Sequence, residues 1–244
     1  WFRYVGDYLV GWWKFTENAQ DSSQQGNDGT VYGATHIHEH YEFDGVDDYI
    51  TADSVTADLE NKNMTVSFWM KSGETSGTSF FVSFHDSSGS NKLLIGHQNT
   101  NELKIHNGTV WAGTSSVPVI DNNWHFITIV FDTSADNVSA YIDGNYDFSA
   151  PCSNDFVSTD KFTIGMDWDG TTPSDFYNGL IDEVIIYNRT LTAQEIQEIY
   201  NAGLYHTIDK GDAYIDSGVL DLKHYNRIRE IYFTCVNDSY SNCS

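Results

Sequence analysis

Short segments in which apolar and polar residues alternate recur along most of the chain, and they constrain its fold more than any other feature. In residues 64–71 every second side chain is apolar, as in a strand with one buried face. Residues 125–131 are apolar nearly throughout, which is typical of a strand covered on both sides. Asp143-Gly144 predicts a tight hairpin turn. Further strands are predicted at 79–85, 92–97, 103–106, 138–142 and 161–166. Many short strands between turn residues predict an all-β, two-sheet antiparallel jelly-roll sandwich.

One short helix is predicted near the end of this pattern. Thr192 and Glu195 have the spacing of a capping box, residues 196–200 carry an apolar helical stripe, and Gly203 is expected to end the helix.

The character of the chain changes after this helix, where two more strand-like runs occur. We therefore predict a jelly-roll domain over residues 1–204. Residues 205–244 are a strand-rich tail, which either adds strands to the sandwich or begins a further β domain.

The charge of the chain is strongly negative. Its 244 residues include 12 Lys and Arg against 35 Asp and Glu, a formal net charge of −23. Such a field repels nucleic acids and anionic membrane surfaces, so nucleic-acid binding is not expected. No apolar run reaches the length of a membrane span, so direct membrane insertion is not expected either.

Cysteines and glycosylation signals favour an extracellular or cell-surface location. Cys235 and Cys243 are close enough to form a short disulfide loop that leaves Cys152 over, although a bridge from Cys152 to the tail is the alternative. Six Asn-x-Ser/Thr signals occur, which is a mild excess and supports a glycoprotein. They lie at Asn63, Asn107, Asn137, Asn188, Asn237 and Asn242.

Several blocks, in order, resemble the laminin-G-like domains of the concanavalin A-like lectin/glucanase family. The blocks are Leu9–Phe15 with Asp21–Ser23 and Gly26–Thr30, Phe43–Ile50, Thr65–Lys71, Asn123–Phe126, Tyr141–Gly144, Phe162–Gly165 and Asn178–Thr192. The resemblance covers residues 8–203. It implies a jelly roll of two antiparallel sheets, often with bound calcium, in an extracellular multidomain protein.

Calcium is the cofactor that the resemblance and the many Asp residues favour, because this hard cation prefers carboxylate and carbonyl oxygens on turns. Two sets of ligands are candidates, and the alternative is that these Asp residues cap turns through hydrogen bonds. The first set is Asp21, Asn27, the carbonyl of Thr30, and Asp182. The second set is Asp44, Asp47 and Asp48.

Catalysis is not expected. The family's glucanases carry carboxylates that project from one strand onto one concave face. Here Asp182 and Glu183 are adjacent, so regular strand alternation would send them to opposite faces. The chain is therefore predicted to be a non-enzyme.

Sugar binding is the leading expectation, because exposed aromatic rings beside polar loop residues suit it. Trp111, Trp168 and Tyr177 lie in loop-like contexts, and Asp167 and Asp169 flank one of them. The alternative for each ring is ordinary packing.

We therefore expect an extracellular recognition module, a lectin or adhesion domain, that binds glycans or surface proteins and is stabilised by calcium. One alternative is a structural domain of a surface layer, filament or virion that assembles with copies of itself. Another is an accessory module of a carbohydrate-active enzyme.

Overall fold

The fold is a sandwich of two large antiparallel sheets, as the alternating pattern predicts. The computed structural model describes residues 8–153 and 156–209. The first sheet contains β1 (Leu9–Trp13), β3 (Thr35–Ile37), β4 (His40–Asp44), β6 (Met64–Lys71), β11 (His125–Asp132), β12 (Asn137–Ile142), β13 (Asn145–Pro151) and β17 (Asn178–Tyr187). The second contains β2 (Thr30–Tyr32), β5 (Tyr49–Thr51), β7 (Thr78–His85), β8 (Asn91–Gln98), β9 (Glu102–His106), β10 (Trp111–Pro118) and β14 (Lys161–Ile164).

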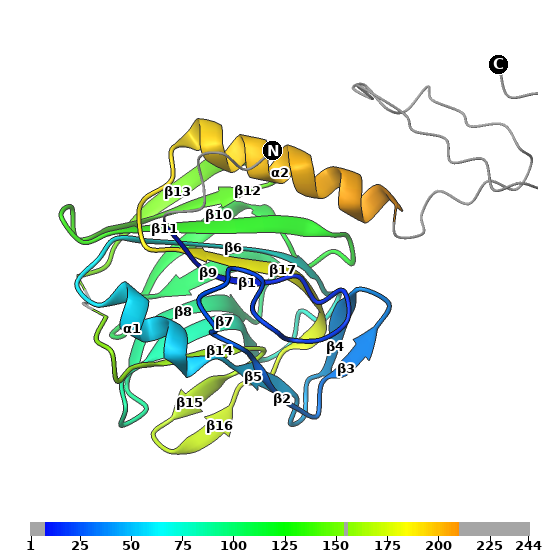
Figure 1. The fold of residues 1–244 in the computed structure, drawn as a ribbon, viewed down its shortest axis with the longest axis horizontal. Helices are drawn as coiled ribbons and strands as arrows, with labels where there is room; N and C mark the ends of the chain where they lie inside the picture. The colour runs from blue at the N-terminus through cyan, green and yellow to red at the C-terminus, as the bar shows by residue number, and fades with distance from the viewer. Residues whose placement is uncertain (1–7, 154–155, 210–244) are drawn as a thin grey trace, which may run out of the picture. The chain divides into compact units, whose positions relative to one another are not determined.

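The remaining elements lie outside the two sheets. They are the hairpin β15 (Asp167–Asp169) and β16 (Thr172–Ser174), and the helices η2 (Asp53–Val55), α1 (Thr56–Leu59) and α2 (Ala193–Asp209). Figure 1 shows β12, β11, β6 and β17 of the first sheet above β8, β7 and β14 of the second, with α2 over the outer face of the first sheet and the β15–β16 hairpin below the second. No helix among the described residues is long and apolar enough to cross a membrane.

Strand order brings distant segments together. In the first sheet the order is β13-β12-β11-β6-β17-β4-β3, with β1 also paired to β17, and in the second it is β10-β9-β8-β7-β14-β5-β2. The predicted strands agree with the observed ones to within two residues at their ends. The predicted hairpin turn is also confirmed, since Asp143 and Gly144 both have positive φ, 51° and 76°, between β12 and β13.

Aromatic side chains fill the space between the sheets. Trp13, Phe43, Phe68, Phe84 and Phe162 are all fully buried there. Burial of such a ring stabilises the fold by about 2–3 kcal/mol relative to exposure. Cys152 is buried in the same core.

The outer face of the first sheet is covered by α2. Ile196 is fully buried in a second apolar cluster with Ile185 and Tyr187 of β17. The Tyr200 ring stacks on Trp69 of β6 at 5.6 Å. The polar positions of β6 are therefore buried as well, whereas the alternation alone predicts a strand with one solvent face.

The start of α2 follows the sequence prediction and its end does not. The Glu195 backbone N–H bonds to Thr192 Oγ1 and the Thr192 N–H bonds to Glu195 Oε2, which completes the capping box. The helix then continues past Gly203 to Asp209, so the predicted stop is wrong. A Cβ on Gly203 would lie 2.6 Å from Trp69 Nε1, so this glycine permits close packing of the helix on the sheet. The rest of the predicted tail, with Cys235, Cys243, Asn237 and Asn242, lies outside the described residues.

Candidate functional site

Asp21, in the first predicted calcium set, is engaged by hydrogen bonds from the protein. Its carboxylate accepts from the backbone N–H of Trp12, Ser23 and Asn27 and from Ser23 Oγ, at 2.6–3.0 Å. Burial alone would raise the pKa of Asp21, but these hydrogen bonds lower it below its ordinary value. A carboxylate accepts about four such bonds. The structure thus favours a turn-organising role for Asp21 over metal ligation.

The other members of that set are held in different ways. Asn27 is buried and donates to the carbonyl of Val10 and to Asp58. Thr30 lies on the exposed strand β2. Asp182 is buried on β17, and its Oδ1 accepts the N–H of Glu183.

The backbone at Asp182-Glu183 does not follow regular strand alternation. Glu183 has φ of 50°, and the register between β17 and β6 shifts between Asp182 and Ile185. The argument that alternation separates the two carboxylates is therefore wrong in its geometry. Their surroundings still differ, because Asp182 is buried and Glu183 accepts a hydrogen bond from Trp12 Nε1 at 3.1 Å.

The second predicted calcium set is brought together. Ligand oxygens of Asp44, Asp47 and Asp48 lie within 4.8 Å of one another, and this is the sole cluster of three or more such side chains among the described residues. We call it the acidic turn. Burial is the main effect that raises the pKa of Asp48. The hydrogen bond from the Asp44 N–H opposes this rise, whereas the charges of the nearby carboxylates add to it. The donor set fits a hard divalent cation, which would relieve this repulsion.

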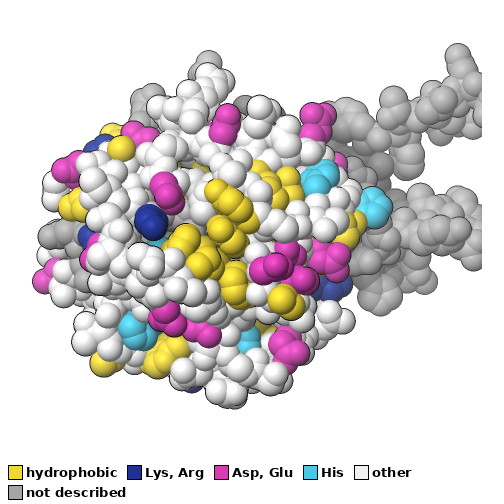
Figure 2. All heavy atoms as spheres, turned by 90° about the horizontal axis from the view of Figure 1, so that it is seen from below, with side chains coloured by type: hydrophobic (Ala, Val, Ile, Leu, Met, Phe, Trp, Pro, Cys, Tyr) yellow, Lys and Arg dark blue, Asp and Glu magenta, His cyan; other side chains and the backbone are white. Residues whose placement is uncertain are grey.

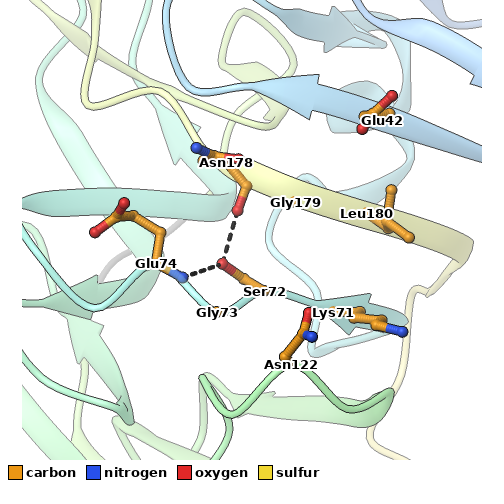
Figure 3. Close-up of a pocket in the computed structure, with 9 residues that line it drawn as sticks. All are labelled: Glu42, Lys71, Ser72, Gly73, Glu74, Asn122, Asn178, Gly179 and Leu180. Atoms are coloured by element: carbon orange, nitrogen blue, oxygen red, sulfur yellow. Dashed lines mark hydrogen bonds between the residues drawn. The ribbon is translucent and has the colours of Figure 1, made fainter.

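A polar cavity of about 390 Å³ adjoins the acidic turn, a volume typical of small-ligand pockets. Figure 3 shows that Glu42, Leu180 and Lys71 enter it from three adjacent strands, β4, β17 and β6. Ser72 Oγ donates to the Asn178 carbonyl at 2.7 Å and ties two walls together. The full lining is Glu42, Lys71, Ser72, Gly73, Glu74, Asn122, Asn178, Gly179 and Leu180. No aromatic ring lines this cavity.

An aromatic stack lies on the other side of the acidic turn. Tyr32 of β2 faces Tyr49 of β5, and their rings stack at 4.5 Å with an interplanar angle of 12°. Ile50 is buried in the core, so its neighbour Tyr49 points to the outer face of the second sheet. A Cβ on Gly33 would lie 2.0 Å from Asp48 Oδ1, which places the acidic turn directly beside this stack.

The β15–β16 hairpin extends the aromatic surface. Trp168 packs edge-on against Tyr49 with centroids 6.3 Å apart, and Phe176 lies 6.4 Å from the same ring. Lys161 Nζ lies 4.4 Å from the centroid of Trp168. We call Tyr32, Tyr49, Trp168 and Phe176 the aromatic surface. Figure 2 shows this side of the molecule, with hydrophobic side chains gathered near its centre and acidic ones beside them.

The hairpin is anchored by a buried polar network. Ser83 Oγ and Thr163 Oγ1 both donate to the carbonyl of Met166, which leads into β15. Ser174 Oγ donates to Asp167 Oδ1 at 2.8 Å. Burial raises the pKa of Asp167 to about 7, and repulsion from Asp175 and Asp169 adds to this effect, whereas the bond from Ser174 opposes it.

The predicted sugar-binding residues separate into three groups. Trp168 is half-buried and belongs to the aromatic surface, and the exposed Asp169 directly follows it in the chain. Asp167 is 2% exposed and Tyr177 is fully buried, with its hydroxyl donating to the Lys71 carbonyl, so neither can contact a sugar and both predictions are wrong. Trp111 stacks on Phe80 at the opposite edge of the second sheet, on β10.

Sequence reasoning missed Tyr32, Tyr49 and Phe176. In each strand a tyrosine and a threonine flank one apolar residue, which indicates that tyrosine and threonine share the polar face. The sequence does not show that β2 pairs with β5, so it could not predict that the two tyrosines meet.

Four predicted glycosylation sites lie among the described residues, and all four are half-buried. The side-chain nitrogens of Asn107 and Asn188 donate to the carbonyls of Pro151 and Asp58. The oxygen of Asn63 accepts hydrogen bonds from Thr133. Asn137 begins β12. Glycosylation at any of them stays a prediction.

The sequence matches a family model, described as the concanavalin A-like lectin/glucanases superfamily, over residues 44–197. A comparison with curated proteins gave no match.

Solved structures share the fold at low sequence identity. Domain 4 of AbnA, a GH43 extracellular arabinanase from Geobacillus stearothermophilus in complex with arabinotriose, matches at a TM-score of 0.62 and 21% identity, over 79% of this chain and 98% of that one. The binding domain of Paraclostridial Mosquitocidal Protein 1 matches at 0.66 and 16% identity, over 81% and 53%. A Trypanosoma rangeli sialidase mutant displaying trans-sialidase activity matches at 0.66 and 19%, over 80% and 33%. At these identities the likeness establishes the fold, which glycosidases and non-catalytic binding domains share.

Proposed function

Because the chain belongs to the concanavalin A-like lectin/glucanase superfamily, we propose that it is a non-catalytic carbohydrate-binding module whose sugar lies on the aromatic surface. The stack of the exposed Tyr32 on the half-buried Tyr49 is the observation that carries this proposal. Tyr32 is 45% exposed, and β2 is the last strand of its sheet, so no further strand within residues 8–153 and 156–209 covers the other face of the ring.

The chemistry of the surface suits a sugar. The apolar face of a pyranose or furanose ring can pack on a flat aromatic ring, while its hydroxyls need polar partners at the rim. Asp169 directly follows Trp168 and Asp47 lies two residues before Tyr49, and the exposed carboxylates of both can accept those hydroxyls. The arabinotriose named for the AbnA domain is the first ligand class to test here.

Replacing Tyr32 by Ala is expected to weaken oligosaccharide binding at least about tenfold, because the stacking platform is lost. Tyr32→Phe keeps the ring and serves as the matched control, with binding close to that of the unchanged protein. The measurement is titration calorimetry with a sugar identified on a glycan array, arabinan oligomers included.

Two results would count against this site. Unchanged binding in Tyr32→Ala together with loss in Asn122→Ala would move the site to the polar cavity. Absence of binding to every sugar, with self-association of the module, would favour the structural role in a surface layer or filament.

We also propose that calcium binds at the acidic turn. Asp44, Asp47 and Asp48 would supply the carboxylate oxygens, and the ion would neutralise their repulsion and stiffen the turn beside Tyr49. The support is the mutual approach of three carboxylates and the raised pKa of Asp48.

Calcium is expected to raise the melting temperature, and a chelator to reverse the rise. A ligand at a hundred times its Kd adds about 2.7 kcal/mol to the free energy of unfolding. Asp47→Asn should remove most of this response, whereas Asp21→Asn should lower stability with and without calcium and keep the response. A melting temperature that ignores calcium and chelator in the unchanged protein would refute the proposal.

The location that fits these proposals is extracellular or at the cell surface, where calcium is abundant and polysaccharides are accessible. A role as the accessory module of a carbohydrate-active enzyme is compatible with the same site. Binding of the isolated module to an insoluble polysaccharide, without hydrolysis, is the expected behaviour.

A further inference from the structure

The acidic side chains around the aromatic surface determine which sugars it can accept. Asp169 directly follows Trp168, and Asp175 directly precedes Phe176. Both Asp residues are exposed at the edge of the β15–β16 hairpin. Asp48, which is buried and is the last residue of the acidic turn, directly precedes Tyr49. Trp168, Phe176 and Tyr49 therefore each have a carboxylate as an immediate neighbour in the chain.

The carboxylates of the hairpin lie close enough for their charges to repel one another. Burial raises the pKa of Asp175, and the charge of Asp169 raises it further. Both of these side chains also raise the pKa of the buried Asp167. The negative potential at this end of the surface thus comes from several groups acting together.

The carboxylates outnumber the basic groups near this surface. Lys161 contacts the Trp168 ring from one side, at 4.4 Å from its centroid. Lys92 forms an ion pair with the buried Asp160 at 2.8 Å. Lys104 lies near Trp111, which is at the other edge of the sheet. The chain as a whole carries a net charge of −23, so its far field also repels anions.

We propose that the aromatic surface binds uncharged oligosaccharides and rejects those that carry carboxylate, sulfate or sialic acid groups. This rests on the proposed function, and it adds a selection rule to it. The physical cause is that a like charge placed beside Asp169 and Asp175 raises the free energy of the complex, while a neutral hydroxyl is a good hydrogen-bond donor to the same carboxylates.

The test compares matched neutral and anionic oligosaccharides on the full chain, in calcium and in chelator. At 0.05 M salt we expect every anionic oligosaccharide to bind at least about tenfold more weakly than its uncharged counterpart. The gap should narrow at 1 M salt, where the screening length falls to about 3 Å. Calcium is expected to neutralise the acidic turn and not the hairpin. Comparing calcium with chelator therefore separates the repulsion of anionic sugars by the hairpin from their repulsion by the acidic turn.

A double variant, Asp169→Asn with Asp175→Asn, tests the residues themselves. Asn tolerates the φ of 47° at position 175, so the backbone is expected to be kept. This variant should gain several-fold in binding of anionic oligosaccharides and change little toward neutral ones. Glu60→Gln with Glu198→Gln is the matched control, because it removes the same charge from the C-cap of α1 and from α2 and should leave the preference intact.

The possible failures are distinguishable. Tyr32-dependent binding of an anionic sugar, as tight as that of its neutral counterpart at low salt, overturns the selection rule and leaves the proposed function standing. Equal preferences in the Asp169/Asp175 variant and the control overturn the assignment to the hairpin. Failure to bind any sugar overturns the proposed function together with this inference.

Discussion

Asp167→Asn is expected to stabilise the protein at pH 8 and to leave its stability nearly unchanged at pH 4. The folded-state pKa of Asp167 is raised to about 7 by burial and by its acidic neighbours, against 3.8 for an ordinary Asp. The folded state therefore holds its proton more tightly than the unfolded state, and stability falls as the pH rises from about 4 to about 7. Asn carries no charge and keeps an oxygen for the bond from Ser174 Oγ.

The size of the effect follows from the shift. Each pKa unit corresponds to about 1.4 kcal/mol, so a gain of about 1–3 kcal/mol in the free energy of unfolding is expected at pH 8 after allowance for relaxation. The measurement is the melting temperature of variant and unchanged protein across pH 4–8, compared at each pH so that the other carboxylates cancel.

Asp86→Asn is a control of opposite sign. Hydrogen bonds from Ser88 Oγ and from the Ser90 and Ser88 N–H groups lower the pKa of Asp86 to about 2. Its ionised form is the one that the fold stabilises, so this contribution is present above the unfolded pKa near 4 and disappears as the pH falls toward 2. Asp86→Asn should thus lower stability at neutral pH. If the stability difference between Asp167→Asn and the unchanged protein does not vary with pH, the pKa of Asp167 is not raised and the prediction is refuted.

Gly165→Ala is expected to cost about 2–4 kcal/mol of folding free energy. Gly165 has φ of +91°, and a Cβ there would lie 2.5 Å from two ring carbons of the fully buried Phe43. The substitution combines an unfavourable backbone conformation with overpacking of the core, each worth about 1–2 kcal/mol or more. For a domain of this size each kcal/mol lowers the melting temperature by about 2–4 °C.

Gly26→Ala separates the two causes. Gly26 has a similar φ of +81°, but no atom lies within 4 Å of the added Cβ. It should show the backbone penalty alone, and the difference between the two variants measures the contact with Phe43. Equal melting temperatures for both would refute the packing argument. Phe43 precedes the acidic turn, so Gly165→Ala should also weaken any calcium response.

The fold was predictable from residues 64–71 and 125–131 because strand alternation and apolar runs are local consequences of which face is buried. The capping box of Thr192 and Glu195 was predictable for the same reason, since both partners lie within one helical turn. The continuation of α2 beyond Gly203 was not, because the glycine meets Trp69 of a distant strand.

Some residues of the candidate site could likewise be predicted from the sequence, and others could not. The approach of Asp44, Asp47 and Asp48 follows from their nearness in sequence, and this set could be proposed from the chain alone. The burial of Asp167 and Tyr177 could not, because β15 packs on β7 and Tyr177 packs on Phe43 and Phe81, all of which are remote in sequence. From sequence alone, a polar or aromatic residue in a loop is expected to be exposed, because the distant segments that pack on it are not known.

By itself the sequence determined a two-sheet β sandwich, a strongly negative surface and an acidic turn, because strand periodicity, net charge and local turns depend on neighbouring residues. Only the tertiary structure decided that Tyr32 stacks on Tyr49 beside that turn and that the β15–β16 hairpin brings Trp168 and Asp169 to the same face. The first contact needs the pairing of β2 with β5, and the second needs β14 beside β5, which joins segments more than a hundred residues apart. Side-chain alternation specifies which residues share a face, but pairing between distant strands specifies which of them meet.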